Sequence, residues 1–314
     1  MLPWPCGVGP DRPAAESPPG GQRSPFRYFQ ATLLQLHNLG VALLHFIRTA
    51  LVGLVLFVLL GVGVLAFWMT YEGNDPRMSV GDRNNFSRGE YLAFAVPWGG
   101  EQGIMRFWAP HADKVRIDLL HFPNNTGFQF SWPPFSPRGG VAGVWGYMGI
   151  EHGNYDGAAA EAPVPARRVD DIKVLSQTFA WSRQTRAGTA DVLTEFYLRS
   201  DPEEPESKLL EIGWFLHIPD KARGYAEKGK PIGSYTDGEG RHWLVVRDEK
   251  FVMFLAKDGA DVRSGRIDML AALKWLKQQK VVSGREWYTG VAIGVEPFGG
   301  FGRLQIDKWS VDYR

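Results

Sequence analysis

An uncharged apolar run of 22 residues, from Ala50 to Tyr71, restricts the folding of this chain more than any other feature. At a rise of about 1.5 Å per residue, a helix of this length crosses a hydrocarbon core roughly 30 Å thick. Phe67, Trp68 and Tyr71 place aromatic rings at its C-terminal end, as is typical of a helix that meets the membrane interface. We therefore expect a transmembrane helix over residues 49–71.

The charges beside this run predict its orientation. Before it lie four arginines, Arg12, Arg23, Arg27 and Arg48, and two acids, whereas the segment after it carries both signs. Because positive flanks stay in the cytoplasm, the N-terminus is predicted to be cytoplasmic and the remainder extracytoplasmic, either periplasmic or extracellular. A cleaved signal peptide is the alternative. The run starts late and lacks a small-residue cleavage site, which favours an uncleaved signal anchor and a single-pass membrane protein.

Composition divides the rest of the chain into three segments. Residues 1–48 begin with a stretch rich in Pro, Gly, Ser and Arg and are predicted to form a cytoplasmic tail and juxtamembrane segment. Residues 72–88 are expected to be a short polar linker. Residues 89–314 alternate polar and apolar positions over short runs that Gly, Pro, Asn and Asp separate, which predicts an all-β sandwich or barrel.

One segment of this β-rich domain has helical periodicity instead. The spacing predicts a helix from Arg266 to Gln279, with Ser264 or Gly265 as its cap. Its apolar stripe consists of Ile267, Leu270, Leu273 and Leu276.

Several classes of function are not expected from the composition. The formal net charge of +1 argues against nucleic-acid binding, which needs a concentrated positive field. Cys6 is the only cysteine, so neither an intrachain disulfide nor a cysteine metal site can form. The histidines of the β-rich domain lack metal-ligand spacing, and the glycines at 299–302 do not open a helix, so no metal, cofactor or nucleotide is expected.

Glutamates stand in strand patterns that are otherwise apolar. Because side chains alternate across a strand, Glu211 lies on the face opposite Leu210, Ile212, Trp214 and Leu216. By the same reasoning Glu296 and Glu195 also point away from the core. A carboxylate in such a strand is costly unless it faces a groove or does chemistry, so the three predict a shared carboxylate surface. Ordinary solvated residues on the open face of a sandwich are the alternative.

The segments around these glutamates resemble motifs of glycoside hydrolase family 12. The stretch Glu211 to Phe215 is similar to the nucleophile strand E-L/I-M-I-W, and Gly294 to Phe298 is similar to the acid/base segment G-T-E-P-F. The resemblance covers most of the domain in family order. Its other segments are Trp98-Gly99, Phe179 to Ser182, Thr194 to Phe196, Pro231 to Gly233, Trp243 to Ala256, the predicted helix and the closing strand.

The resemblance implies a concanavalin A-like β-jelly roll of two curved antiparallel sheets with one helix, and retaining endo-hydrolysis of β-1,4-glucans such as cellulose, mixed-linkage β-glucan or xyloglucan. Glu211 would be the nucleophile, Glu296 the acid/base, and Glu195 an assisting carboxylate where the family has aspartate. The implied partner is a β-glucan polysaccharide. The implied substrate-binding residues are Trp98, Phe215, Phe298, Pro231 and Ile232. A non-catalytic polysaccharide-binding jelly roll at the cell envelope is the alternative.

Four positions depart from the family pattern. Gly213 replaces a methionine, Ala292 a glutamine, Val295 a threonine and Val96 an asparagine. These changes remove polar contacts and are expected to widen the cleft, which affects the choice of glycan more than the reaction.

Overall fold

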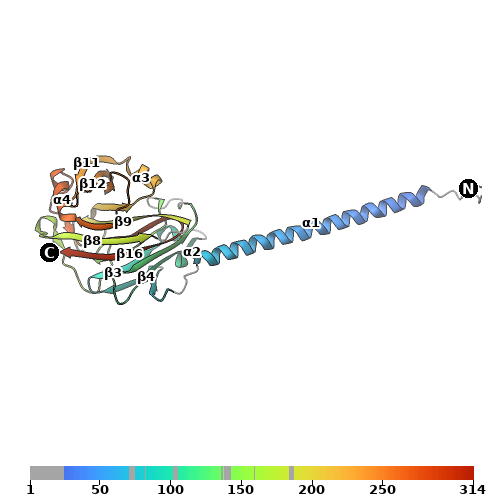
Figure 1. The fold of residues 1–314 in the computed structure, drawn as a ribbon, viewed down its shortest axis with the longest axis horizontal. Helices are drawn as coiled ribbons and strands as arrows, with labels where there is room; N and C mark the ends of the chain where they lie inside the picture. Colours follow the sequence, from blue (N-terminus) through green and yellow to red (C-terminus); the bar gives the residue numbers. More distant parts are fainter. Residues whose placement is uncertain are drawn as a thin grey trace, which may run out of the picture. The chain divides into compact units, whose positions relative to one another are not determined.

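The computed structural model describes residues 25–70, 75–81, 83–101, 105–135, 137, 143–158, 160–183 and 187–314. The chain divides into two compact units, Met1–Ala66 and Phe67–Arg314, and each is described by itself (Figure 1). The first 24 residues of the predicted tail lie outside the described residues.

The described part of the first unit belongs to helix α1 (Pro25–Thr70), whose last turn extends beyond Ala66. Its stretch Leu34–Phe67 is long and apolar enough to cross a membrane, and its large apolar side chains are exposed. A signal sequence would meet the same criteria. The helix begins well before the apolar run from which it was predicted, because residues 25–48 are also free of proline after Pro25 and rich in good helix formers.

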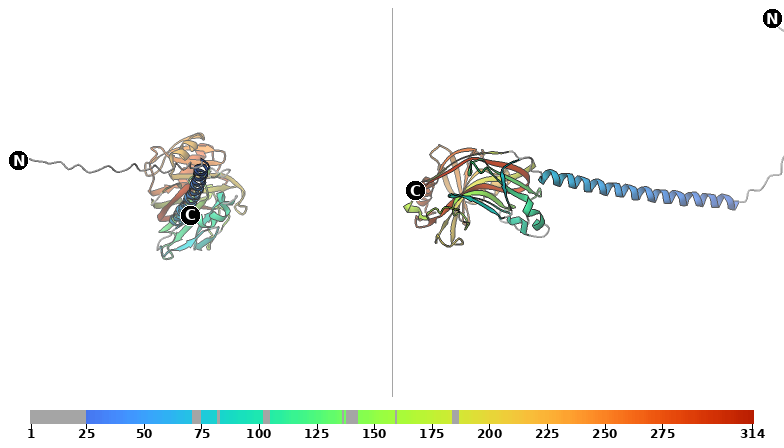
Figure 2. Two further views of the ribbon diagram at one scale, coloured as in Figure 1. Left: turned by 90° about the vertical axis from the view of Figure 1, so that its right-hand side faces the viewer. Right: turned by 90° about the horizontal axis from the view of Figure 1, so that it is seen from below.

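The second unit is a β sandwich whose strands can be followed in Figure 1 and from two further directions in Figure 2. Its strands are β1 (Met78–Val80), β2 (Asn85–Arg88), β3 (Tyr91–Val96), β4 (Asp113–Ile117), β5 (Thr126–Trp132), β6 (Tyr147–Gly153), β7 (Arg167–Arg168), β8 (Leu175–Arg183), β9 (Ala187–Arg199), β10 (Lys208–His217), β11 (Lys230–Thr236), β12 (His242–Asp248), β13 (Phe251–Ala256), β14 (Ser264–Asp268), β15 (Trp287–Tyr288) and β16 (Gly290–Tyr313).

The long strand β16 joins the two layers of the sandwich. Its first half pairs with β6 and β9, and the layer continues in the order β2-β3-β6-β16-β9-β10-β13-β12-β11. Its second half pairs with β5 and β8, in the order β1-β4-β5-β16-β8-β14. The pairs are antiparallel except β10 with β13, which is parallel. This is the predicted all-β jelly roll.

The core between the layers is aromatic. Trp132, Trp214, Trp243 and Trp309 are each at most 1% exposed, and rings of this size contribute most of the buried apolar area. A second buried cluster covers the opposite face of the β6-β16-β9-β10-β13 strands, and we call that face the site face. Both clusters are formed within residues 80–309, and no described residue of α1 belongs to either. The β domain therefore has its own core and is expected to fold without α1.

The helix prediction was correct in place but wrong in its start. Residues Ser264–Asp268 form β14, paired with β8, and helix α4 covers Met269–Gln278. The cap is Asp268, whose carboxylate accepts the backbone N–H of Ala271 at 2.9 Å, rather than Ser264 or Gly265. Two further short helices are present, α2 (Met105–Ala112) and α3 (Asp220–Ala226), so the expectation of a single helix in the domain was also wrong.

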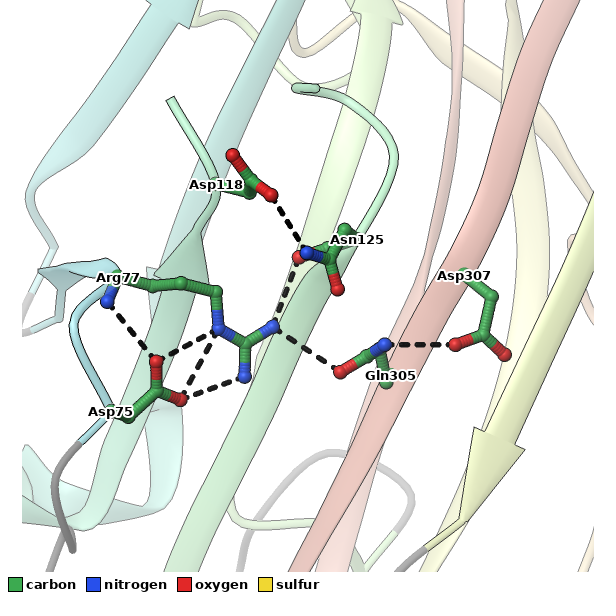
Figure 3. A network of polar contacts seen from close by, with 6 residues as sticks. All are labelled: Asp75, Arg77, Asp118, Asn125, Gln305 and Asp307. Carbon is green, nitrogen blue, oxygen red and sulfur yellow. Dashed lines mark hydrogen bonds and ion pairs between the residues drawn. The ribbon is translucent and has the colours of Figure 1, made fainter. Parts of the chain in front are cut away.

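The segment expected to be a linker, residues 72–88, contains two strands of the sandwich. Strand β1 pairs with β4 and β2 pairs with β3. Hydrogen bonds of the Arg77 guanidinium connect this segment to the rest of the domain. The guanidinium donates to the Asp75 carboxylate at 2.7 Å, to the Asn125 carbonyl at 2.9 Å and to the Gln305 side chain at 3.2 Å (Figure 3). The β domain thus begins earlier in the sequence than the composition indicated.

Candidate active site

Three neighbouring strands bring the predicted glutamates together on the site face. Glu195 on β9 stands between β10 and β16, opposite Gly213 on one side and Ala292 on the other. Glu211 on β10 lies opposite Tyr197, which places it diagonally from Glu195. The predicted alternation is confirmed, because each glutamate has at least one flanking residue in the core between the layers: Leu210 and Ile212 beside Glu211, Phe196 beside Glu195, and Val295 beside Glu296.

These glutamates are not ordinary solvated residues of an open sheet. Glu195 is only 3% exposed, and Glu211 and Glu296 are partly buried. Burial in a protein disfavours the charged form of a carboxyl group. Burial accordingly raises the pKa of each of the three above its usual range.

The contacts of Glu195 distribute protons between two of the carboxyl groups. The Tyr155 hydroxyl donates a hydrogen bond to Glu195, and the Glu195 and Glu211 side chains share a hydrogen bond. A hydrogen bond between two carboxyl groups requires one proton. Burial and the charges of Glu211 and Glu296 raise the pKa of Glu195 well above its usual range. Burial also raises the pKa of Glu211, whereas the hydrogen bond with Glu195 and the charge of Lys208 oppose that rise.

Asp191 is a fourth carboxyl group at this site that the sequence pattern did not single out. It is 1% exposed, lies directly opposite Glu296 in the β9-β16 register, and accepts the Glu296 backbone N–H at 3.2 Å. Burial, followed by the charges of Asp191 and Glu211, raises the pKa of Glu296 well above its usual range. Its face was readable from the sequence, because Asp191 shares the odd-numbered face of β9 with Glu195, but its position opposite Glu296 was not.

Tyrosines complete the polar surroundings. The rings of Tyr155 and Tyr197 stack with centroids 5.0 Å apart, and Tyr147 from β6 lies edge-on to Tyr155 at 6.2 Å. Burial and the charges of Glu195 and Glu296 raise the pKa of Tyr147 well above its usual range. Its buried hydroxyl has no hydrogen-bond partner among the described residues.

The predicted substrate-binding residues divide into two groups. Three of them lie on the site face. The ring centroids of Trp98 and Tyr147 are 6.5 Å apart, Phe215 belongs to the buried cluster of that face, and Phe298 lines the same cavity as Glu296. Pro231 and Ile232 are not brought to the glutamates: they lie on the outer strand β11, and Ile232 packs against the core between the layers. The resemblance of this short segment to the family motif could not reveal its position. A bulge between Pro231 and Gly233 changes which face of the sheet the side chains of β11 point to.

The expected widening of the cleft at Gly213 was wrong. A Cβ atom at Gly213 would lie 2.9 Å from the ring of Phe251 on the parallel neighbour β13, so that ring fills the space. Similarly, a Cβ atom at Gly294 would lie 2.6 Å from the Tyr147 ring. The small residues beside the glutamates accommodate aromatic rings of the protein itself.

A cavity of about 720 Å³ opens beside Glu296 and Asp191. Its wall also includes Phe215, Phe251 and residues of α3. Among the described residues, no group of three or more His, Cys, Asp or Glu is arranged to hold a metal ion.

No family model matches the sequence, and no curated protein matches it. Solved structures do match the fold. A native family 12 xyloglucanase from Bacillus licheniformis superposes with a TM-score of 0.59 at 19% identity, covering 76% of this chain and 100% of its own. This chain therefore has the fold of the family 12 glycoside hydrolases. Endoglucanase 3 of Trichoderma harzianum has a TM-score of 0.57 at 19% identity, covering 77% and 100%. An endoglucanase from Rhodothermus marinus has a TM-score of 0.57 at 14% identity, covering 76% and 100%.

Proposed function

We propose that the protein is a retaining endo-acting glycoside hydrolase that cleaves β-1,4-glucan chains outside the cytoplasm. The observation that carries this proposal is the carboxyl cluster of Glu195, Glu211 and Glu296 on one buried face of the fold. Solved structures of this fold are titled as xyloglucanases and endoglucanases, and one, from Humicola grisea, is in complex with a thio cellotetraose.

Each carboxyl group would act in its favoured protonation state. The ionised Glu211 attacks the anomeric carbon as the bond to the leaving oxygen breaks, while Glu296 transfers its proton to that oxygen. In the second step water attacks the glycosyl-enzyme ester, Glu296 takes the water proton, and Glu211 leaves as a carboxylate. Glu195 positions Glu211 by hydrogen bonding, and the raised pKa of Glu296 keeps its proton available at neutral pH.

The proposal is tested with the 75–314 fragment on carboxymethylcellulose, barley β-glucan and xyloglucan. We expect release of reducing sugar, with the product formed initially in the β configuration by NMR. Glu211→Gln and Glu296→Gln should each lower kcat by about 10²–10⁴-fold. Glu203→Gln, on an exposed loop, is the matched control and should retain activity.

An activated aryl cellobioside separates the two roles. A dinitrophenolate leaves without a proton, so Glu296→Gln should lose far less activity on that substrate than on β-glucan, whereas Glu211→Gln should lose both. Glucan binding without sugar release in the wild-type protein would instead favour the non-catalytic polysaccharide-binding alternative.

The proposed location follows from α1. With the N-terminus cytoplasmic, the helix would hold the hydrolase at the outer side of the membrane. Protease added to spheroplasts, in which an extracellular or a periplasmic domain is accessible, should then digest the β domain, and membrane fractions should retain the full chain. Recovery of the domain in the medium with a new N-terminus would show a cleaved signal sequence instead.

A further inference from the structure

The cavity beside Glu296 is more apolar than a sugar requires. Its inner wall includes the rings of Phe215, Phe251 and Phe298 and the thioether of Met253. Phe215 and Met253 are 7% and 5% exposed, so this wall is part of the buried cluster of the site face. Lys221 and Asp248, which also line the cavity, are exposed residues at its rim.

A glucose ring carries hydroxyl groups around its whole edge. Each of them loses free energy when it leaves water without a new hydrogen-bond partner. The apolar inner wall can cover the faces of a ring but supplies few partners for its edge. A cavity of about 720 Å³ with mostly apolar walls and a few polar groups at one end is typical of a site for an apolar ligand with a polar end.

The position of the cavity indicates which part of a substrate it would hold. Glu296 lines it, together with Asp191, whereas Glu211 and Glu195 do not. In the proposed reaction the general acid lies beside the leaving oxygen, and the nucleophile lies beside the glycosyl carbon. The group that occupies the cavity is therefore the leaving group.

We propose that this cavity receives the aliphatic aglycone of a β-linked glycolipid, so that the bond cleaved beside Glu296 joins a glucan chain to a lipid and the lipid takes the place of the glucan leaving group. This inference rests on the proposed function. Helix α1, long and apolar enough to cross a membrane, is consistent with it, because a membrane-anchored hydrolase works where glycolipids are present. Glu296 protonates the lipid oxygen as the glycosyl group moves to Glu211, and water then releases the sugar, so one water is consumed and a lipid alcohol is formed.

Alkyl β-cellobiosides of increasing length, from methyl through butyl and hexyl to octyl, are the probes for this inference. The 75–314 fragment avoids competition from the detergent that the full chain would need. We expect kcat/KM to rise with chain length, by up to about fourfold for each methylene group that is fully buried.

Helix α3 offers a matched pair of variants. Ala222 lines the cavity, and Ala222→Asp places a charge in its wall, so the dependence on chain length should be lost. Gly224 lies two positions further along the same helix and does not line the cavity, and a Cβ atom there would meet nothing within 4 Å. Gly224→Asp should therefore leave the dependence unchanged.

Two results would overturn the inference while leaving the proposed function intact. One is that the protein hydrolyses β-glucan while its kcat/KM for the alkyl β-cellobiosides is the same from methyl to octyl. The other is a gain from an additional reducing-end glucose but not from alkyl length, which would show that the cavity holds a sugar.

If no β-glucoside is hydrolysed, the proposed function fails, and calorimetry still decides the nature of the cavity. Tighter binding of octyl than of methyl cellobioside, lost in Ala222→Asp but retained in Gly224→Asp, would support the apolar site. Equal affinities for the two glycosides would refute it.

Discussion

Replacing Asp113 by asparagine is predicted to stabilise the β domain at neutral pH and not at acidic pH. Asp113 on β4 is fully buried. Its Oδ1 accepts the indole N–H of Trp132 at 2.6 Å, whereas its Oδ2 has no hydrogen-bond partner among the described residues. Burial raises the pKa of Asp113 from 3.8 to about 7, although the Trp132 hydrogen bond acts in the opposite direction.

The sign and size follow from proton linkage. Below about pH 4 the carboxyl group is protonated in both the folded and the unfolded chain and has no electrostatic cost. Between about pH 4 and pH 7 only the folded state retains the proton, so stability falls as pH rises. Above pH 7 the whole cost is present, and a pKa rise from 3.8 to about 7 corresponds to about 4 kcal/mol.

Asp113→Asn retains an acceptor for Trp132 and carries no charge at any pH. The difference in unfolding free energy between the variant and the wild type should therefore grow by about 4 kcal/mol from pH 4 to pH 7.5. For a domain of this size that corresponds to roughly 10 °C in Tm, measured by thermal unfolding of the 75–314 fragment at a series of pH values.

Asp118→Asn is the control for this experiment. Hydrogen bonds from His121 and Asn125 hold the pKa of Asp118 well below its usual range, so its removal should cost stability at neutral pH instead. A Tm difference between Asp113→Asn and the wild type that does not change with pH would refute the reasoning.

Two predictions concern the site itself. Asp191→Asn removes an ionisable group beside Glu296 and keeps an acceptor for its N–H. Burial raises the pKa of Asp191 itself, so at pH values where Asp191 is ionised the variant should have a lower pKa at Glu296, and the alkaline limb of kcat/KM should move to lower pH; an unmoved limb would show that Asp191 does not act on the acid. Gly213→Ala should cost about 1–3 kcal/mol in urea unfolding, because its Cβ would lie 2.9 Å from the Phe251 ring. Phe251→Leu in the same chain should recover part of that loss, and purely additive losses would argue against the clash.

The strand period made much of the site predictable from the sequence. Side chains alternate strictly along β9, β10 and β16, so the faces of Glu195, Glu211 and Glu296 could be assigned without any knowledge of strand pairing. The amphipathic stripe of α4 was recognisable for a similar reason. The start of α4 was not, because Ile267 fits the helical stripe equally well when it is buried in β14.

Features that depend on pairing between distant segments were not predictable. Phe251 fills the space at Gly213 because β13 runs parallel to β10, and no local pattern specifies that pairing. The same holds for Asp191, whose importance comes from its register with Glu296. Its own surroundings in the sequence distinguish it only as an acid at the start of an apolar strand.

The central strand gives the two glutamates of the proposed reaction different surroundings. Strand β9 lies between β10 and β16 and contributes one carboxyl group to each side, Glu195 toward Glu211 and Asp191 toward Glu296. In the proposed reaction Glu195 is the protonated partner in its pair, and its hydrogen bond lowers the pKa of Glu211. Asp191 instead accepts a backbone N–H, and its charge, where Asp191 is ionised, opposes ionisation of Glu296. A single strand thus favours an anion on one neighbour and a bound proton on the other, which is the division that a nucleophile and a general acid require.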